Sequence, residues 1–288
     1  MTDHLLELPG IPNARELGGY AAGGKAIKRG LLIRTARIDQ AEAEAVSILQ
    51  KRYHLQTIVD FRMTEEKNLM PDPDVPGCEN LFHSVMDLKE AVEGNPEVIK
   101  RSGGSAEKAL AGIGKILSRY TDPGADRIAL LNGMCESGIL KTDIYQGFLL
   151  NERGKEAYRA FFRAVLELDS DRAILWHCTD GKDRTGCAAM LLLFALGASR
   201  ETVMEDYLIT NKVNEKKLAA AREQAEACHL EGDKLDLLLF ISGGAIESFM
   251  NRAIDTLDER YGSVEGYLEQ ELGVGKAELA ELRGRYLV

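Results

Sequence analysis

One stretch of this chain, residues 173–186, places a cysteine and an arginine at a spacing that suits phosphate chemistry. It reads Ala-Ile-Leu-Trp-His-Cys-Thr-Asp-Gly-Lys-Asp-Arg-Thr-Gly and runs directly into an apolar helical pattern. Five residues separate Cys178 from Arg184, so the loop between them can curl with its backbone N–H groups pointing inward and end at a helix N-terminus. The pattern predicts a strand, a tight loop and a helix that together hold a dianionic phosphate.

Each residue type in this loop has a chemical role. The positive field of such a cradle favours a thiolate at Cys178, and the thiolate is the nucleophilic form of cysteine. Arg184 can clamp phosphate oxygens with its planar guanidinium. The residues expected to bind phosphate are Thr179, Asp180, Gly181, Lys182, Asp183 and Arg184.

The neighbours of the loop support the same interpretation. His177 can orient the loop through its ring nitrogens, and the Thr185 hydroxyl can donate to the sulfur and ease its departure. Lys182 adds a second cation, which suits a substrate with a further phosphate or a carboxylate. A lone cysteine is more often a small buried hydrophobe, and we interpret Cys187 in this way; a reversible disulfide with Cys178 is the alternative.

The composition is that of a soluble globular protein with an acidic balance. The 288 residues include 46 Asp and Glu against 36 Lys and Arg, which gives a formal charge of −10. This charge argues against nucleic acid as a partner, because nonspecific binding of nucleic acid needs a basic surface. An anionic ligand must therefore find a local positive pocket.

Cysteine usage and the first residues predict a cytoplasmic location. The five cysteines are an odd number without metal-ligand spacing, which favours a reducing compartment and no metal centre. The chain does not open with a basic and then a long apolar segment, so we expect no secretory signal, although export without one stays open. The apolar runs 187–198 and 235–246 are shorter than the roughly 20 residues that span a bilayer. We expect buried helices there and no transmembrane segment.

The elements around the loop follow the pattern of an α/β protein. Strands that alternate with helices predict βαβ units and a three-layer core in which helices flank a parallel sheet. A segment from Asp39 to Lys51 predicts a capped helix, and 154–168 predicts another with one apolar face. The predicted strands are 31–34, 56–61, 81–85 and 173–176.

Two further regions complete the chain, which we interpret as one domain over residues 1–288. Residues 87–142 mix Gly, Ser, Pro and charge, with one weak helix at 109–119, and predict a variable insertion or lid. From about residue 200 to 288, Leu, Ile and Met recur at helical spacing. This pattern predicts a helical C-terminal third whose apolar faces pack on the core.

The motif at 177–186 resembles the signature of the cysteine-dependent protein tyrosine phosphatases. Its Gly-Lys-Asp-Arg-Thr-Gly part is similar to the bacterial and fungal branch, which has dual tyrosine/serine and phosphoinositide activity. Further landmarks of that family occur in family order at 12–20, 29–34, 58–62 and 261–268. Residues 87–142 have no clear match.

The resemblance implies a fold, a mechanism and a class of substrate. The fold would be a four-stranded parallel sheet flanked by helices, and the reaction would pass through a cysteinyl-phosphate intermediate without a metal or organic cofactor. By position, Cys178 would be the nucleophile and Arg184 the phosphate clamp. The expected substrates are phosphorylated proteins, phosphoinositides or small phosphomonoesters, and the product is inorganic phosphate.

The identity of the general acid is open, because the chain has no Trp-Pro-Asp tripeptide. Asp183 lies inside the loop beside Arg184, and Asp87 follows the strand 81–85, where a mobile acid loop would begin. Either can protonate the leaving oxygen if it comes within about 3 Å of it. Each also has a structural alternative, since Asp183 can brace the loop and Asp87 can cap the strand end.

One aspartate and several arginines are expected to support the site. Asp60 ends a strand that should neighbour the strand before Cys178, so it can position nearby loops. The arginines lie near strand ends that should open at the same rim, where they can form a positive collar that focuses a phosphorylated substrate. These arginines are Arg15, Arg34, Arg37 and Arg62, of which Arg15 and Arg62 are the two most expected to serve the site.

Three classes of function are compatible with a cysteine between a strand and a helix. A phosphomonoester hydrolase uses every feature described above. A catalytically inactive docking module would bind a phosphorylated partner without needing the thiolate. Sulfur transfer also uses a loop cysteine, but the Lys-Asp-Arg-Thr-Gly continuation fits phosphate better. We therefore predict a phosphatase, with the docking module as the alternative.

Overall fold

The computed structural model describes residues 4–120, 122 and 124–288. The chain forms two compact units. Unit 1 comprises Met1–Val85, Tyr145–Tyr207 and Met250–Val288, and unit 2 comprises Met86–Ile144 and Leu208–Phe249. The cysteine loop lies in unit 1.

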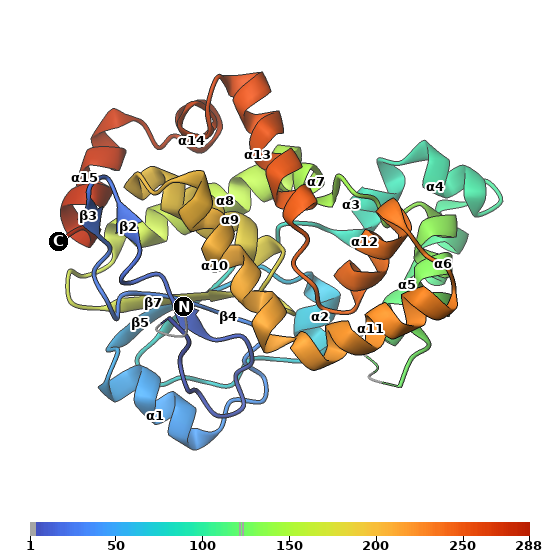
Figure 1. Ribbon diagram of the computed structural model, residues 1–288. Helices are drawn as coiled ribbons and strands as arrows, with labels where there is room; N and C mark the ends of the chain where they lie inside the picture. The colour runs from blue at the N-terminus through green and yellow to red at the C-terminus, as the bar shows by residue number, and fades with distance from the viewer. Residues whose placement is uncertain (1–3, 121, 123) are drawn as a thin grey trace. The chain divides into compact units, whose positions relative to one another are not determined.

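A five-stranded sheet in the order β1-β4-β7-β5-β6 forms the centre of unit 1 (Figure 1). The strands are β1 (Arg15–Glu16), β4 (Leu32–Thr35), β5 (Leu55–Asp60), β6 (Glu79–Phe82) and β7 (Ala173–His177), with a separate hairpin of β2 (Ala21–Ala22) and β3 (Lys25–Ala26). The four longer strands are parallel, which confirms the prediction, and β1 adds an antiparallel edge of two residues.

Strand β7 lies between β4 and β5, so the cysteine loop leaves from the middle of the sheet. The residues paired with His177 are Thr35 on β4 and Asp60 on β5. Every residue of β4 and β7 is buried, as expected for parallel strands covered by helices on both faces. Because the carboxyl ends of parallel strands meet at one edge, the segments that follow these three strands come together there.

Helices cover both faces of this sheet (Figure 1). Helix α1 (Ala43–Lys51) lies on one face, where its buried residues share a core with Ile58 and Leu175. Helix α8 (Glu152–Glu167) lies on the other face, where the ring centroids of Phe161 and Trp176 are 5.2 Å apart. An aromatic pair of this kind stabilises the packing by about 1 kcal/mol beyond its buried area. The predicted three-layer α/β core is therefore confirmed.

The remaining helices complete unit 1 and lead into unit 2. The helices of unit 1 are α1 (Ala43–Lys51), α2 (Thr64–Leu69), α8 (Glu152–Glu167), α9 (Arg184–Leu196), α14 (Val264–Leu272) and α15 (Lys276–Tyr286). Three helices contain a boundary between the units: α7 (Ile144–Leu150), α10 (Arg200–Val213) and α13 (Glu247–Tyr261). The helical region predicted after residue 200 is confirmed. None of the described helices is both long enough and apolar enough to cross a membrane.

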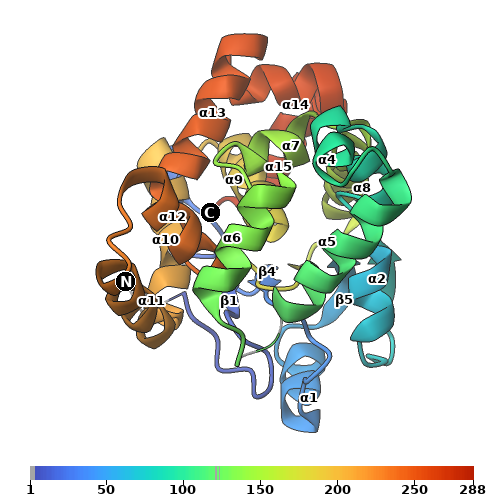
Figure 2. The same ribbon diagram turned by 90° about the vertical axis from the view of Figure 1, so that its right-hand side faces the viewer.

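All the elements described in unit 2 are helices. They are α3 (Leu88–Glu93), α4 (Pro96–Arg101), α5 (Ala106–Tyr120), α6 (Arg127–Ser137), α11 (Glu215–Ala227) and α12 (Gly232–Ile241), together with parts of α10 and α13. Helices α5 and α6 lie side by side (Figure 2). A small apolar cluster of Val92, Val98, Ala109 and Ile113 joins α3, α4 and α5.

The helix predicted at 109–119 lies within α5, but the prediction of an irregular stretch around it is wrong, because the described residues between 88 and 137 contain three further helices. Asp87, Asn95 and Asp126 each accept a backbone N–H at the start of a helix. Such caps replace hydrogen bonds that helix ends lack. Helices α3 and α4 have six residues each, which is too short for an apolar repeat to reveal them.

Two predicted boundaries also differ from the structure. Helix α1 begins at Ala43, and Asp39 does not cap it but pairs with Arg37. Strand β6 covers residues 79–82 where the apolar pattern predicted 81–85. As an edge strand, β6 pairs only with β5 and keeps its polar residues exposed, so its sequence is not continuously apolar.

Candidate active site

The cysteine loop connects β7 to α9, and its carbonyl groups are held from outside. The Thr179 oxygen accepts the backbone N–H of Arg37 at 3.1 Å. The Asp180 oxygen accepts from Asn13 Nδ2 at 3.1 Å, and the Gly181 oxygen accepts from Arg34 Nη2 at 2.8 Å. Since the N–H of a trans peptide points away from its C=O, three successive N–H groups turn toward the inside of the curl. This orientation of the N–H groups is the one that the predicted anion cradle requires.

Position 181 requires a glycine for two reasons, its backbone conformation and the closeness of its neighbours. Its φ is +67°, in the left-handed region, and a Cβ atom there would lie 2.4 Å from the Thr35 carbonyl oxygen. A side chain at this position would push the loop away from strand β4. The close approach of the loop to β4 therefore depends on this glycine.

Arg184 begins α9 and is held by a carboxylate that we did not predict. Its Nη1 lies 2.5 Å from Glu66 Oε2 and its Nη2 lies 3.0 Å from Glu66 Oε1. Thr179 Oγ1 donates to the same carboxylate. Glu66 lies on α2, just after β5, so the strand-end reasoning applied to Asp60 could have found it.

The charge of Glu66 is stabilised by these contacts. Burial by itself would raise the pKa of Glu66, but the charge and hydrogen bonds of Arg184, with those of Thr179 and the Met63 N–H, lower it to about 2. Burial would likewise lower the pKa of Arg184, and the Glu66 carboxylate outweighs this and raises it well above its usual value. Both partners are therefore charged at any pH at which the protein would work.

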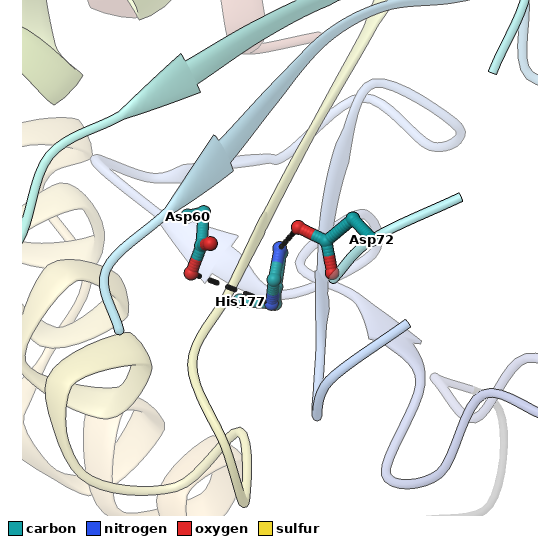
Figure 3. Close-up of side chains that lie close together, drawn as sticks. All are labelled: Asp60, Asp72 and His177. Atoms are coloured by element: carbon teal, nitrogen blue, oxygen red, sulfur yellow. Dashed lines mark ion pairs between the residues drawn. The ribbon is translucent and has the colours of Figure 1, made fainter. Parts of the chain in front are cut away.

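Asp60, Asp72 and His177 lie close together directly before Cys178 (Figure 3), and Arg62 binds both aspartates. Arg62 Nη2 lies 2.9 Å from Asp60 Oδ2 and 2.8 Å from Asp72 Oδ1. His177 Nε2 lies 3.2 Å from Asp72 Oδ2, and its Nδ1 lies 4.0 Å from Asp60 Oδ1. Burial would raise the pKa of Asp60, but Arg62 and His177 lower it. The expected position of Asp60 beside the strand of Cys178 is confirmed.

The same cluster has a spacing that could hold a metal ion. One ligand atom each of Asp60, Asp72 and His177 lie within 4.8 Å of one another. Arg62, however, contacts both carboxylates through Nη2. Its guanidinium already supplies the positive charge between them, so these residues do not suit a resident cation.

Arg15 and Arg34 share the carboxylate of Asp206 behind the loop. Arg15 Nε lies 2.9 Å from Asp206 Oδ1, and Arg34 Nη1 contacts Oδ2. Burial and the neighbouring Arg34 charge lower the pKa of Arg15 to about 10, against the effect of Asp206. Two guanidinium groups against one carboxylate leave a net positive charge beside Gly181, which favours an anion in the loop.

The predicted positive collar is wrong. The side chains of Arg15, Arg34 and Arg62 have no solvent exposure and are bound to carboxylates. Only Arg37 of the four is partly exposed, and it pairs with Asp39. Arg15, Arg34 and Arg62 point into the protein, because long charged side chains at these buried strand ends find acidic partners rather than water.

Asp183 has contacts that suit bracing of the loop. Its Oδ1 accepts from Tyr145 Oη at 2.7 Å and from Lys182 Nζ at 3.0 Å. Tyr145 and Tyr207 are joined by a further hydrogen bond of 2.6 Å. Burial, and then the Asp183 charge, raise the pKa of Tyr145 well above its usual value. The ammonium group of Lys182 is completely buried, so its charge is used within the protein.

Asp87, the other predicted acid, belongs to unit 2 and caps a helix there. Its Oδ1 accepts the backbone N–H of Glu90 at 3.0 Å, which starts α3. Asp87 therefore acts as a cap, as the structural alternative predicted, but it caps the start of a helix and not the end of a strand. Asp87 thus belongs to unit 2, whereas the cysteine loop belongs to unit 1.

The remaining predicted residues lie in the loop or directly after it. Cys178 is almost completely buried, and Cys187 is buried in α9, as predicted. Both are free thiols, and burial raises the pKa of Cys187 far above its usual value. Thr185 Oγ1 is buried, and no described residue forms a hydrogen bond with it. This hydroxyl therefore keeps an unused hydrogen-bond donor.

Comparison with known proteins agrees with this geometry. The model of the tyrosine phosphatase family matches residues 6–288. A candidate tyrosine-protein phosphatase of Cupriavidus necator is 30% identical over 285 residues, which cover 99% of this chain and 89% of that protein. The triple specificity protein phosphatase PtpB of Mycobacterium tuberculosis is 26% identical over 296 residues, which cover 96% of this chain and 97% of that protein.

The chain belongs to the tyrosine phosphatase family. A tyrosine-protein phosphatase of Nostoc commune shares 32% identity over 116 residues, or 40% of this chain and 39% of that protein. As a tyrosine phosphatase the protein is a phosphoric monoester hydrolase, which acts on phosphorylated substrates and releases phosphate. The resemblance predicted from the sequence is confirmed.

Proposed function

We propose that Cys178 is the nucleophile of this phosphatase and that Arg184 and the loop N–H groups bind the phosphoryl group. The observation that carries the proposal is the orientation of the loop, whose carbonyls at 179–181 are all held from outside. N–H groups arranged in this way are ready for an anion before it arrives, so little reorganisation is needed during the reaction.

In the first step, the Cys178 thiolate attacks phosphorus in line with the leaving oxygen. The S–P bond forms while the P–O bond to the leaving group breaks, and the leaving oxygen takes a proton from the general acid. Arg184 and the loop N–H groups stabilise the negative charge on the three equatorial oxygens. The product of this step is a cysteinyl phosphate.

In the second step, water attacks the phosphorus of this intermediate. The carboxylate left by the general acid takes a proton from the water, the S–P bond breaks, and inorganic phosphate leaves with the restored thiolate behind it. The Thr185 hydroxyl is buried without a hydrogen-bond partner among the described residues, and it would donate to the departing sulfur. This donation stabilises the thiolate as a leaving group.

Asp183 and Asp87 are the two residues proposed to supply the proton. One oxygen of Asp183 already accepts from Tyr145 and Lys182, which suits a brace as well as an acid. Asp183→Asn and Asp87→Asn separate the roles in a pH–rate profile with p-nitrophenyl phosphate. The variant that loses the basic limb identifies the acid, and a variant with an unchanged profile is excluded.

Phosphotyrosine is the proposed substrate group, with phosphoserine, phosphothreonine and phosphoinositides as further candidates. The family name and the triple specificity of one relative support a comparison of these esters side by side.

We also propose a cytoplasmic location, because the cysteines are odd in number and their thiols are free. The interpretation of residues 1–288 as one domain stays a prediction.

The deciding experiment is steady-state hydrolysis of p-nitrophenyl phosphate, with a chelator present. The Cys178→Ser variant should lose at least about a thousandfold in kcat, and should still bind inorganic phosphate in a calorimetric titration. Cys228→Ser is the control, because Cys228 is exposed and lies outside unit 1. Full activity of Cys178→Ser would overturn the mechanism. An inactive wild type that binds phosphate would favour the docking module.

A further inference from the structure

The chain that follows β5 contacts both ends of the cysteine loop. We name residues 61–72 the crossover segment. Within it, Asp72 meets His177, the residue before Cys178, and Glu66 meets Arg184, the residue after the loop. Neither carboxylate is part of the phosphate-binding motif, and neither was predicted.

At the Arg184 end, both oxygens of the Glu66 carboxylate accept hydrogen bonds. Its Oε1 accepts from Arg184 and Thr179, and its Oε2 accepts from Arg184 and from the Met63 N–H at 2.8 Å. The last contact closes the first turn of α2. Glu66 therefore connects the guanidinium and the loop to a fixed helix end.

The contacts of Glu66 leave part of the guanidinium for a ligand. They occupy the two terminal nitrogens of Arg184, and no described residue accepts from its Nε. A planar guanidinium that is gripped along one edge presents its remaining N–H groups in a defined direction. An Arg184 without Glu66 would be free to rotate about its side-chain bonds.

At the His177 end, Asp72 is fixed by its own neighbours. Pro71 and Pro73 flank it, and each proline restricts the backbone. The His177 ring is completely buried, with Nε2 3.2 Å from Asp72. The Nδ1 atom of the ring lies 3.4 Å from the Cys178 carbonyl oxygen and 4.0 Å from Asp60 Oδ1, and Arg62 binds both Asp60 and Asp72.

Burying these two carboxylates costs desolvation free energy, which indicates a role beyond filling space. Glu66 and Asp72 have side-chain exposures of 18% and 14%. Well-packed apolar residues often stabilise a fold as well as a buried ion pair does. The Glu66–Arg184 ion pair and the close Asp72–His177 contact lie at the two ends of one loop and are better explained by what they do to that loop.

We propose that the crossover segment clamps the cysteine loop at both ends, with Glu66 and Asp72 as positioning residues that act through Arg184 and His177. The inference rests on the proposed function, because it concerns the geometry in which Arg184 and Cys178 meet phosphate. Small errors of orientation at a reacting centre are costly in rate. Both contacts are therefore expected to affect catalysis without touching substrate.

We call the Glu66–Arg184 and Asp72–His177 contacts the two arms of the clamp. The Glu66 arm is tested with Glu66→Gln, and the control is Glu65→Gln, because Glu65 is the exposed neighbour of Glu66 on the same helix. We expect kcat/KM and phosphate affinity of Glu66→Gln to fall about tenfold or more, because the bidentate grip is lost. Glu65→Gln should match the wild type. A variant that binds phosphate more tightly and keeps its turnover would overturn this arm, because Glu66 would then be a competitor for the phosphate position.

The Asp72 arm is tested with Asp72→Asn and Asp72→Ala, and with Asp74→Ala as the exposed control from the same stretch of chain. We expect Asp72→Ala to lose about tenfold in kcat with little change in KM, since His177 adjoins the nucleophile and not the phosphate clamp. Asp72→Asn keeps an acceptor oxygen and should recover most of the rate. A lower melting temperature with unchanged kcat in both variants would show a structural role only.

The clamp and the proposed function fail in different ways. Suppose that wild type and Asp74→Ala turn over, and that either Glu66→Gln or Asp72→Ala has the same rate as the wild type. The two-ended clamp is then wrong and the phosphatase mechanism stands. If the wild type has no turnover, the mechanism fails. The phosphate titrations, which need no turnover, then still test the Glu66 arm, and unchanged affinity in Glu66→Gln would overturn the clamp as well.

Discussion

The cysteine loop and helices α3–α6 are held by opposite kinds of contact. Around the loop the partners come from distant parts of the chain: Asp206 is 191 residues from Arg15, and Glu66 is 118 residues from Arg184. In α3 and α6, the caps Asp87 and Asp126 accept N–H groups three residues ahead. The loop is assembled by tertiary structure, whereas these helices carry their own start signals.

The two regions also differ in what they bury. The loop is surrounded by charged side chains without solvent exposure, such as Arg15, Arg34 and Lys182. The core of α3–α5 is a small aliphatic cluster. Removing one partner of a buried ion pair leaves a charge without compensation, while removing a cap exposes one N–H to water. The comparison predicts unequal costs, which single substitutions can measure.

The largest effect is expected at Asp206, whose carboxylate is shared by two buried arginines. Asp206→Ala should lower the free energy of unfolding by about 3–5 kcal/mol, because both guanidinium groups lose their carboxylate. Urea unfolding of this variant, with Glu205→Ala as the exposed neighbour, gives the measurement. A loss no larger than that of the control would remove the distinction between the two regions.

The next effect depends on pH and comes from Glu66. Its pKa is lowered from 4.5 to about 2 in the folded protein, so its stabilisation is complete above its unfolded value and is lost as the pH falls toward 2. The contribution at neutral pH is about 3 kcal/mol. The stability difference between wild type and Glu66→Gln should shrink between pH 5 and 2, while that of Glu65→Gln stays flat. A pH-independent difference would contradict the assignment.

A smaller loss of stability is expected at Gly181, where a comparison with Gly77 separates backbone strain from the steric clash of a Cβ atom. Gly181 and Gly77 both have positive φ, but a Cβ on Gly77 would meet nothing within 4 Å. Gly181→Ala should therefore be about 2 kcal/mol less stable than Gly77→Ala and should also bind phosphate more weakly, because the Thr35 carbonyl must move. Equal losses in the two variants would mean that strain alone acts at Gly181.

The smallest effect is expected in α6. Asp126 accepts the N–H groups of Ile128 and Ala129 at 2.9 and 3.1 Å, so Asp126→Ala should cost about 1 kcal/mol. Hydrogen exchange should show faster exchange in the first turn of α6, with phosphate affinity unchanged. The exposed Glu136→Ala, on the same helix, is the control. A larger loss than that of Asp206→Ala would reverse the comparison.

The sequence by itself determined the strands around the loop and the positions of the proposed nucleophile and the proposed phosphate clamp. These features depend on local spacing: five residues between Cys178 and Arg184, apolar runs for buried parallel strands, and a glycine where φ is positive. Short-range geometry of this kind follows from bond lengths, backbone conformations and hydrogen-bond patterns that do not depend on distant residues. The family resemblance could be predicted for the same reason.

Only the tertiary structure decided which charged side chains meet. It turned Arg15, Arg34 and Arg62 inward and paired them with Asp206, Asp60 and Asp72, where a surface collar had been predicted. It also brought Glu66 to Arg184. A long charged side chain can reach water or any of several partners, and its choice depends on which strand ends lie side by side. That information comes from the assembled sheet and not from residue spacing.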